Sequence, residues 1–265
     1  MKKLLWLTAT IPLLFACSEN AVTGRKTLAF VSEAQMQQMA DPQYDSFLKV
    51  NRVLINSDAA MVKRAGQKIA TAISKYYNDQ GKPEVLSGYK WEYNLVDSKE
   101  ANAWCMPGGK IVVYTGLLPL TQTESALAVV MGHEVAHAIL QHGTSRMNEA
   151  VVTQLGGSAL SVLLSTKSAE TQNIFMTAYG VGTQYGSALP NSRKQELEAD
   201  KYGLLFSSLA GYDPRVAVGF WERMAAASNG QKPPEFLSTH PGDATRIARI
   251  KEYLPEALKS YKPAK

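Results

Sequence analysis

The sequence predicts an α+β domain that is mainly helical and contains one small sheet. Runs of apolar residues at spacings of three and four recur along the chain, and this period is typical of helices. One short segment instead alternates apolar and polar residues, and two strand-like runs follow it around a Pro-Gly-Gly turn. With 265 residues, 45% of them hydrophobic, the chain is long enough for one sizeable core. We therefore expect one compact domain with terminal extensions.

The first residues resemble a bacterial lipoprotein signal. A basic start precedes the apolar run 4–15, which is shorter than the roughly 20 residues of a transmembrane helix. The stretch LFAC ends at Cys17 and resembles a lipobox. We expect a signal peptide over residues 1–16 and a lipid anchor at Cys17, which would hold the chain on a membrane without spanning it. The alternative is a cleaved signal that merely contains a cysteine.

The charge balance is only weakly basic. The chain carries 28 Lys and Arg against 23 Asp and Glu, a net charge of +5. Loss of residues 1–16 would remove two lysines and no acid, which leaves about +3. This excess is small and evenly spread, so we expect no nucleic-acid partner.

The elements before the central helix follow from local patterns. Residues 17–55 are polar and mixed, and we expect a tether that becomes an N-terminal helix, ahead of a domain over residues 56–265. Apolar residues at helical spacing predict an amphipathic helix over 59–77. Alternation over 91–95 predicts a half-buried strand. The segment 101–116, with its Pro-Gly-Gly turn, predicts a β-hairpin.

A helix of roughly 20 residues should follow and cross the middle of the domain, because it is apolar on most sides. Thr121 and Glu124 have the spacing of a capping box at its start, and Gly143 suits its C-terminal end. Three further helices are expected, over residues 191–211, 213–228 and 245–258.

The central helix contains the sequence His-Glu-x-x-His. His133 and His137 differ by roughly 40° around a helix, so both imidazoles can reach one ion. Glu134 follows the first histidine, where its carboxylate can act as a general base. Two histidines and a base in this pattern are the signature of a zinc hydrolase. A buried histidine pair without metal is the alternative.

A catalytic zinc ion needs a third protein ligand. His142 lies nine residues after His133, roughly half a turn away on a continuing helix, so we exclude it. Glu196 and Asp200 are four apart on a later helix and face one way. Glu196 would be the third ligand, and Asp200 would accept a hydrogen bond from a ligating histidine. The alternative is that Glu196 and Asp200 lie on a solvent-exposed helix face, as acidic residues on a helix usually do.

The remaining histidine, His240, precedes a proline in a segment with loop composition. It could donate to the oxyanion of a tetrahedral intermediate. It could instead occupy the open zinc position and keep an enzyme latent, or be structural. The sequence leaves these alternatives open.

Four segments resemble the zinc metallopeptidase family of the CAAX prenyl proteases, HtpX, the mitochondrial overlapping-activity protease and BepA, and look most like its bacterial lipoprotein members. These segments are NAWCMPGGKIVVYTGLL, MGHEVAHAILQHG, LPNSRKQELEADKYGLLFSSLAGYDPRVAVGFWERM and STHPGDATRI. Together they spread over roughly residues 60 to 255. The resemblance implies a gluzincin fold whose small sheet lines the active-site cleft with its edge strand, and it assigns the Glu-x-x-x-Asp element to Glu196 and Asp200.

The same resemblance implies further site residues. An extended substrate would pair with the strand that carries Asn102, Ala103 and Trp104, although these residues could simply form a strand. Arg246 matches a recurrent basic position, where it would stabilise charge at the site or brace nearby carboxylates.

The function expected from these residues is zinc-dependent hydrolysis of peptide bonds. The resemblance implies unfolded or misassembled envelope proteins as substrates and a lipid-anchored location, at the periplasmic face of the bacterial outer membrane. A latent zinc protein that acts as a chaperone, and a zinc hydrolase of a non-protein amide, remain the alternatives.

Overall fold

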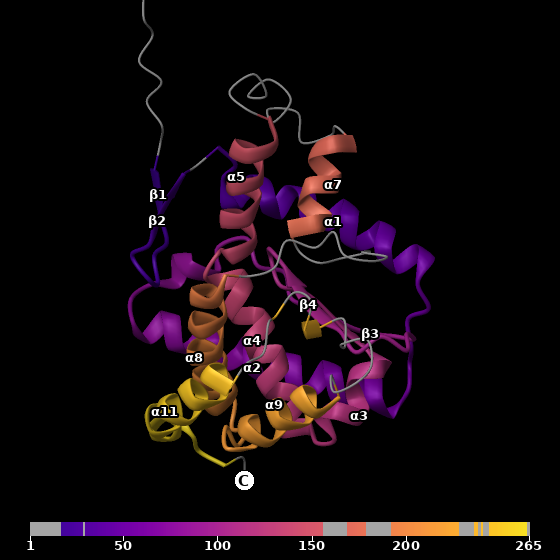
Figure 1. Ribbon diagram of the computed structural model, residues 1–265, viewed down its shortest axis with the longest axis vertical. Helices are drawn as coiled ribbons and strands as arrows, with labels where there is room; N and C mark the ends of the chain where they lie inside the picture. The colour runs from indigo at the N-terminus through magenta and orange to yellow at the C-terminus, as the bar shows by residue number, and fades with distance from the viewer. Residues whose placement is uncertain are drawn as a thin grey trace, which may run out of the picture.

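The computed structural model describes most of the chain and confirms a mainly helical α+β architecture (Figure 1). None of the helices in the described part is long and apolar enough to cross a membrane. The expected signal peptide, residues 1–16, lies outside the described residues. The described ranges are 17–28, 30–155, 169–178, 192–227, 236–237, 240 and 244–263.

The N-terminal elements are packed against the rest of the domain. Strands β1 (Cys17–Glu19) and β2 (Lys26–Leu28) form an antiparallel hairpin, where the sequence suggested only a tether. Helix α1 (Glu33–Val50) begins with a capping box formed by Ser32 and Gln35. The buried side chains of α1 pack on one face of the sheet, so this helix is part of the core.

The second sheet has three strands in the order β3-β5-β4, and their bounds are β3 (Glu92–Val96), β4 (Ala103–Met106) and β5 (Lys110–Tyr114). The predicted hairpin is confirmed, because β4 and β5 pair antiparallel. Gly108 and Gly109 turn the chain between them with φ of 80° and 85°, a conformation that favours glycine. Strand β3 pairs parallel to β5, which leaves β4 and β3 as the two edges.

Helix α2 (Ser57–Asp79) and helix α4 (Glu124–Ile139) pack on the sheet face opposite to α1. The alternation of β4 shows this division, since Ala103 and Cys105 belong to one hydrophobic cluster and Trp104 and Met106 to the other. Helix α4 is buried along nearly its whole length, as predicted for a helix through the middle of the domain.

The predicted ends of the central helix are wrong. Thr121 ends a separate short helix, α3 (Leu118–Thr121), which follows the turn η2 (Thr115–Leu117), and the left-handed Gln122 separates it from α4. The cap is Thr123, whose side chain accepts a hydrogen bond from the Ala126 N–H. At the other end Gln141, with φ of 57°, stops the helix, so Gly143 lies inside the next helix, α5 (His142–Leu155).

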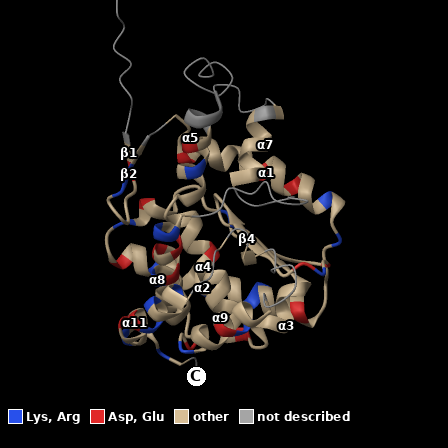
Figure 2. Ribbon diagram, in the orientation of Figure 1, with Lys and Arg blue, Asp and Glu red and all other residues tan. Residues whose placement is uncertain are grey.

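The remaining described elements are η1 (Pro83–Leu86), α7 (Ala169–Ala178), α8 (Arg193–Leu209), α9 (Val216–Ala226) and α11 (Ala244–Ser260). The last three confirm the helices expected in the C-terminal third. Figure 2 shows acidic and basic residues interspersed along α8 and α11.

Helix α8 crosses α4 at a pair of glycines. A Cβ added to Gly132 would lie 2.7 Å from the Gly203 carbonyl oxygen, and one added to Gly203 would lie 2.7 Å from the His133 nitrogen. Any side chain at position 132 or 203 would collide with the backbone of the other helix, so only glycine allows α4 and α8 to approach this closely. The crossing therefore fixes the distance between the His-Glu-x-x-His motif and the acidic residues of α8.

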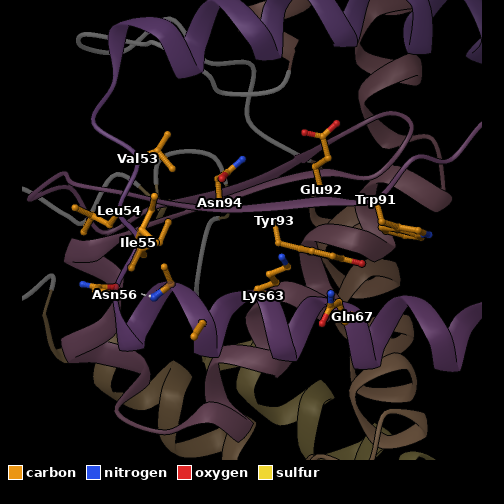
Figure 3. A pocket seen from close by; sticks show the side chains of 13 residues that line it. Val53, Leu54, Ile55, Asn56, Lys63, Gln67, Trp91, Glu92, Tyr93 and Asn94 are labelled. Atoms are coloured by element: carbon orange, nitrogen blue, oxygen red, sulfur yellow. Dashed lines mark hydrogen bonds between the residues drawn. The ribbon is translucent and has the colours of Figure 1, made fainter.

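A groove of about 580 Å³ runs between α2 and the β3 edge of the sheet (Figure 3). Lys63 and Gln67 line it from the helix, and Trp91 and Tyr93 line it from the strand side. None of the predicted site residues contributes to this groove. The chemistry expected from the sequence therefore lies elsewhere, on the α4–α8 crossing.

Candidate metal centre

Three histidines and one glutamate meet on the inner side of the α4–α8 crossing. One possible ligand atom from each of His133, His137, Glu196 and His240 lies within 4.8 Å of the others, and all four residues are buried. His133 and His137 come from successive turns of α4, and Glu196 comes from the first turn of α8. The structure thus brings together the residues that the sequence proposed as ligands.

His240 reaches the cluster through a short link to the sheet. Its backbone N–H donates to the Phe236 carbonyl, and the Phe236 N–H donates to the Ala101 carbonyl just before β4. The two rings are stacked with centroids 4.4 Å apart. These contacts hold the imidazole against the motif although 107 residues separate His240 from His133.

The spacing of these atoms fits a zinc ion. Four ligand atoms held tetrahedrally at ordinary Zn–N and Zn–O lengths lie roughly 3.3 Å from one another. Here His133 Nε2 lies 3.0 Å from His137 Nε2 and 3.5 Å from Glu196 Oε2, and His137 Nε2 lies 3.4 Å from Glu196 Oε1. His240 Nδ1 lies 3.3 Å from His133 Nε2 and 3.0 Å from Glu196 Oε1. The donor set can therefore hold zinc, as predicted.

Glu134 stands beside this cluster without entering it. Its Oε1 is buried and has no hydrogen-bond partner among the described residues, and it lies 3.4 Å from His240 Nε2. Burial raises the pKa of Glu134, against the effect of the nearby histidines. A buried carboxylate with one unsatisfied oxygen and a raised pKa is suited to accept a proton from a reacting group.

His133 is supported from behind by Asp200 and Arg246. Asp200 Oδ1 lies 3.0 Å from His133 Nδ1, the contact predicted for this residue. The Arg246 guanidinium donates to both oxygens of Asp200 at 2.6 and 2.7 Å, lies 2.7 Å from Glu196 Oε2, and stacks 3.7 Å from the Trp221 ring centroid. Of the two roles left open for Arg246, these contacts support the bracing of carboxylates.

The charges at the site favour a cation at the histidines. Burial opposes ionisation of both Glu196 and Asp200, but the Arg246 guanidinium holds the pKa of each below its ordinary value. Burial alone would lower the pKa of His133, yet the carboxylates of Asp200 and Glu196 raise it to about 9. Burial lowers the pKa of His137, which keeps its imidazole neutral and able to bind a metal.

His142, which the sequence excluded as a zinc ligand, has a contact at the site that the sequence did not predict. His142 is outside the ligand cluster, but its Nδ1 lies 2.8 Å from Nδ1 of His137. The direction expected for His142 assumed one continuous helix, whereas α4 ends at Ile139 and α5 begins at His142. Burial lowers the pKa of His142 to about 4, so the ring is neutral. In the sequence, the only sign of this contact was a histidine five residues after the ligand His137. The contact itself depends on the helix break at Gln141.

The strand residues Asn102, Ala103 and Trp104 are buried at the edge of the sheet. The Tyr114 N–H donates to the Asn102 carbonyl, so the backbone of the next residue, Ala103, faces away from β5. The Trp104 side chain lies on the sheet face opposite to α4, edge-on to Phe47 with ring centroids 5.0 Å apart. Trp104 is thus a core side chain.

Comparisons with known proteins agree with this site. The family model described as peptidase family M48 matches residues 56–254. The chain is 38% identical over 175 residues to the mitochondrial metalloendopeptidase OMA1 of Schizosaccharomyces pombe, covering 65% of this chain and 49% of that protein. It is 29% identical over 247 residues to the OMA1 of Homo sapiens, covering 91% of this chain and 46% of that protein.

A bacterial relative is also similar. The chain is 31% identical over 163 residues to the β-barrel assembly-enhancing protease of Escherichia coli, covering 60% of this chain and 33% of that protein. The matched region spans less than half of each of these three relatives. The family model covers the sheet, the histidine motif and the acidic helix, so the similarity extends over the whole cluster. On these grounds the chain belongs to peptidase family M48.

Proposed function

We propose that this protein is a zinc metalloendopeptidase. The observation that carries the proposal is the buried cluster of three histidines and Glu196, with the unsatisfied Oε1 of Glu134 at its side. Ligands of this kind suit zinc, and a free carboxylate beside them supplies a general base. His133, His137 and Glu196 would be the protein ligands. This arrangement supports hydrolysis better than it supports a purely structural metal, for which a base has no use.

The proposed chemistry divides between the metal and the side chains. A bound zinc ion would polarise the scissile carbonyl and lower the pKa of a water molecule. Glu134 Oε1 would take a proton from that water and later give it to the leaving amine. Asp200 would hold the His133 ring in place through Nδ1, and Arg246 would keep Asp200 and Glu196 ionised. His240 Nε2, 3.4 Å from Glu134 Oε1, would donate to the developing oxyanion.

The substrate is proposed to be an extended peptide on the β4 edge of the sheet. Ala103 turns its backbone away from β5, and the metal cluster lies against the same strand through α4. Pairing through the backbone tolerates many sequences, which suits unfolded or misassembled proteins. The outward-facing Ala103 N–H donates to the Asn102 side-chain oxygen at 2.9 Å, and a paired substrate strand would replace this bond.

The cellular setting is a further part of the proposal. A lipid anchor at Cys17 and a role in quality control of envelope proteins rest on the lipobox-like segment and on the similarity to the Escherichia coli protease. The relatives also include mitochondrial enzymes. Microscopy and membrane fractionation of the full chain, compared with a Cys17→Ala variant, test the anchor. Equal release of both forms by aqueous buffer would contradict it.

A latent zinc protein is the second candidate, because His240 lies within the cluster itself. With His240 as a fourth ligand the zinc ion would have no open position, and the protein could hold clients without cleaving them. His240→Ala separates the two functions. Higher peptidase activity in this variant supports the latent form, whereas lower activity supports donation to the oxyanion.

The test of the proposed activity uses zinc-loaded protein starting after Cys17 and an unfolded protein substrate. Glu134→Gln keeps the shape of the side chain and removes the base, so we expect zinc binding to persist and the cleavage rate to fall by about 10² to 10⁴. Metal content is measured on both proteins. Full activity in zinc-loaded Glu134→Gln would remove the assignment of the base.

A further inference from the structure

We infer that His142 is a positioning residue, which with Glu198 and Arg25 behind it holds His137 in the tautomer that presents Nε2 to the metal. The inference rests on the metal site of the proposed function. His142, Glu198 and Arg25 lie outside the ligand cluster, and their effect is on the affinity of the chain for zinc, which can be measured without the peptidase reaction.

A continuous line of contacts leads outwards from His137. Its Nδ1 lies 2.8 Å from Nδ1 of His142, and Nε2 of His142 lies 3.1 Å from Glu198 Oε2. The same carboxylate oxygen accepts a hydrogen bond from Arg25 Nη1 at 3.3 Å. His142 is fully buried, whereas the Glu198 side chain is about 20% exposed, so the line runs from the interior towards the surface.

When His137 binds a metal, only one arrangement of protons gives every contact in this line one donor and one acceptor. Ligation takes the lone pair of His137 Nε2, so its proton must lie on Nδ1 and be donated to Nδ1 of His142. The proton of the neutral His142 ring is then on Nε2, where it is donated to Glu198. Glu198, as a carboxylate, can only accept. Every member of the line thus favours the tautomer that metal binding requires.

The two ligating histidines are therefore supported in different ways. His133 donates from Nδ1 directly to the carboxylate of Asp200. His137 reaches its carboxylate, Glu198, through the ring of His142. A ligating histidine nearly always donates its second N–H to such a partner, and loss of that partner typically lowers metal affinity by about 10- to 100-fold. We expect an effect of that size at His142.

The break between α4 and α5 is what places His142 for this role. Gln141 adopts φ of 57°, which interrupts the helix, and beyond this break His142 Nδ1 lies 2.8 Å from His137 Nδ1. The N-terminal hairpin stabilises this break. Arg25 Nη2 donates to the Leu140 carbonyl at 2.6 Å, and Asn20 Nδ2 donates to the Ile139 carbonyl at 3.3 Å. These bonds satisfy carbonyls that the end of α4 leaves without helical partners.

The test compares two substitutions of nearly equal shape. In His142→Asn the side-chain oxygen stands near the position of Nδ1 and can still accept from His137, whereas His142→Leu has no acceptor. The dissociation constant for Zn²⁺ is measured by competition with a chromophoric chelator, on protein starting after Cys17. We expect His142→Leu to bind zinc about 10- to 100-fold more weakly than wild type, and His142→Asn to recover most of that loss.

Further variants separate positioning from general damage. Glu198→Ala should weaken zinc binding in the same direction, while Glu222→Ala, at an exposed position of α9, should leave it unchanged. Melting temperatures of the metal-free proteins show whether each variant folds. Equal zinc affinity of folded His142→Leu and His142→Asn would overturn the inference. If wild type itself binds no zinc, the proposed function fails instead.

Discussion

The crossing of α4 and α8 at Gly132 and Gly203 leads to a sharp prediction. In Gly203→Ala the new Cβ would lie 2.7 Å from the His133 nitrogen and 2.8 Å from the His133 Cα, both backbone atoms that cannot rotate away. The helices must therefore separate. Such overpacking typically costs about 1–3 kcal/mol, which exceeds the roughly 1 kcal/mol that alanine gains over glycine in a helix.

The displacement should also reach the metal site. Glu196 lies on α8, seven residues before Gly203, while His133 and His137 lie on α4, so separation of the helices moves the glutamate away from the histidines. We expect lower zinc affinity together with a lower melting temperature. A domain of this size loses roughly 2–4 °C for each kcal/mol. Differential scanning calorimetry of the metal-free protein and a chelator competition measure the two effects.

A matched control is Gly219→Ala in α9. There the new Cβ would meet only Arg223 Nη1, at 3.3 Å, the end of a side chain whose Nε and Nη2 donate to the carbonyls of Leu120 and Thr121. A side-chain shift of a few tenths of an ångström accommodates this contact, with no movement of the helix backbone. We expect this variant to be as stable as wild type or more stable by up to about 1 kcal/mol. If Gly203→Ala melts as high as Gly219→Ala, the close approach of the two backbones does not position Glu196, and the geometric argument is refuted.

Two further predictions concern buried charge. Arg246→Met leaves Asp200 and Glu196 buried without their cation, so the free energy of unfolding of the metal-free protein, measured with denaturant, should fall by about 3–5 kcal/mol. Arg246→Lys keeps a positive charge and should lose less. Equal losses in the two variants would show that charge at this position is unimportant. Burial raises the pKa of Glu33 from its ordinary 4.5 to about 7, against the effect of its hydrogen bond from Thr144. The folded chain therefore binds this proton more tightly than the unfolded chain, and wild type should lose stability relative to Glu33→Gln as the pH rises from 4.5 to 7, by at most about 3 kcal/mol. Unfolding curves across that range that stay parallel for the two proteins would contradict the assignment.

Much of the candidate site could be predicted because it depends on helical periodicity. His133 and His137 on one face, and Glu196 and Asp200 on another, follow from a repeat of 3.6 residues that holds wherever a helix is continuous. His142 was rightly excluded as a ligand, but the same regularity hid its contact with His137. Its direction was calculated for an unbroken helix, but the chain leaves the helix at Gln141. Backbone breaks of this kind depend on contacts such as those of Arg25, which are distant in sequence.

The capping error has a similar origin. Thr121 and Glu124 match the spacing of a capping box, but Thr123 caps the helix and the Glu124 carboxylate is hydrogen-bonded to Arg64 and Tyr212. Local spacing specifies which side chains could cap, and tertiary partners decide which of them does.

The sequence by itself determined the mainly helical α+β class, the His-Glu-x-x-His motif and the acidic pair that faces it, because each rests on interactions between neighbours along the chain. Only the tertiary structure decided that His240 joins the cluster, that Arg246 braces Asp200, and that His142 supports His137. These contacts join residues on different elements, or across a helix break. The close approach of α4 and α8 at Gly132 and Gly203, which brings Glu196 to the histidines, is likewise not encoded by any local pattern.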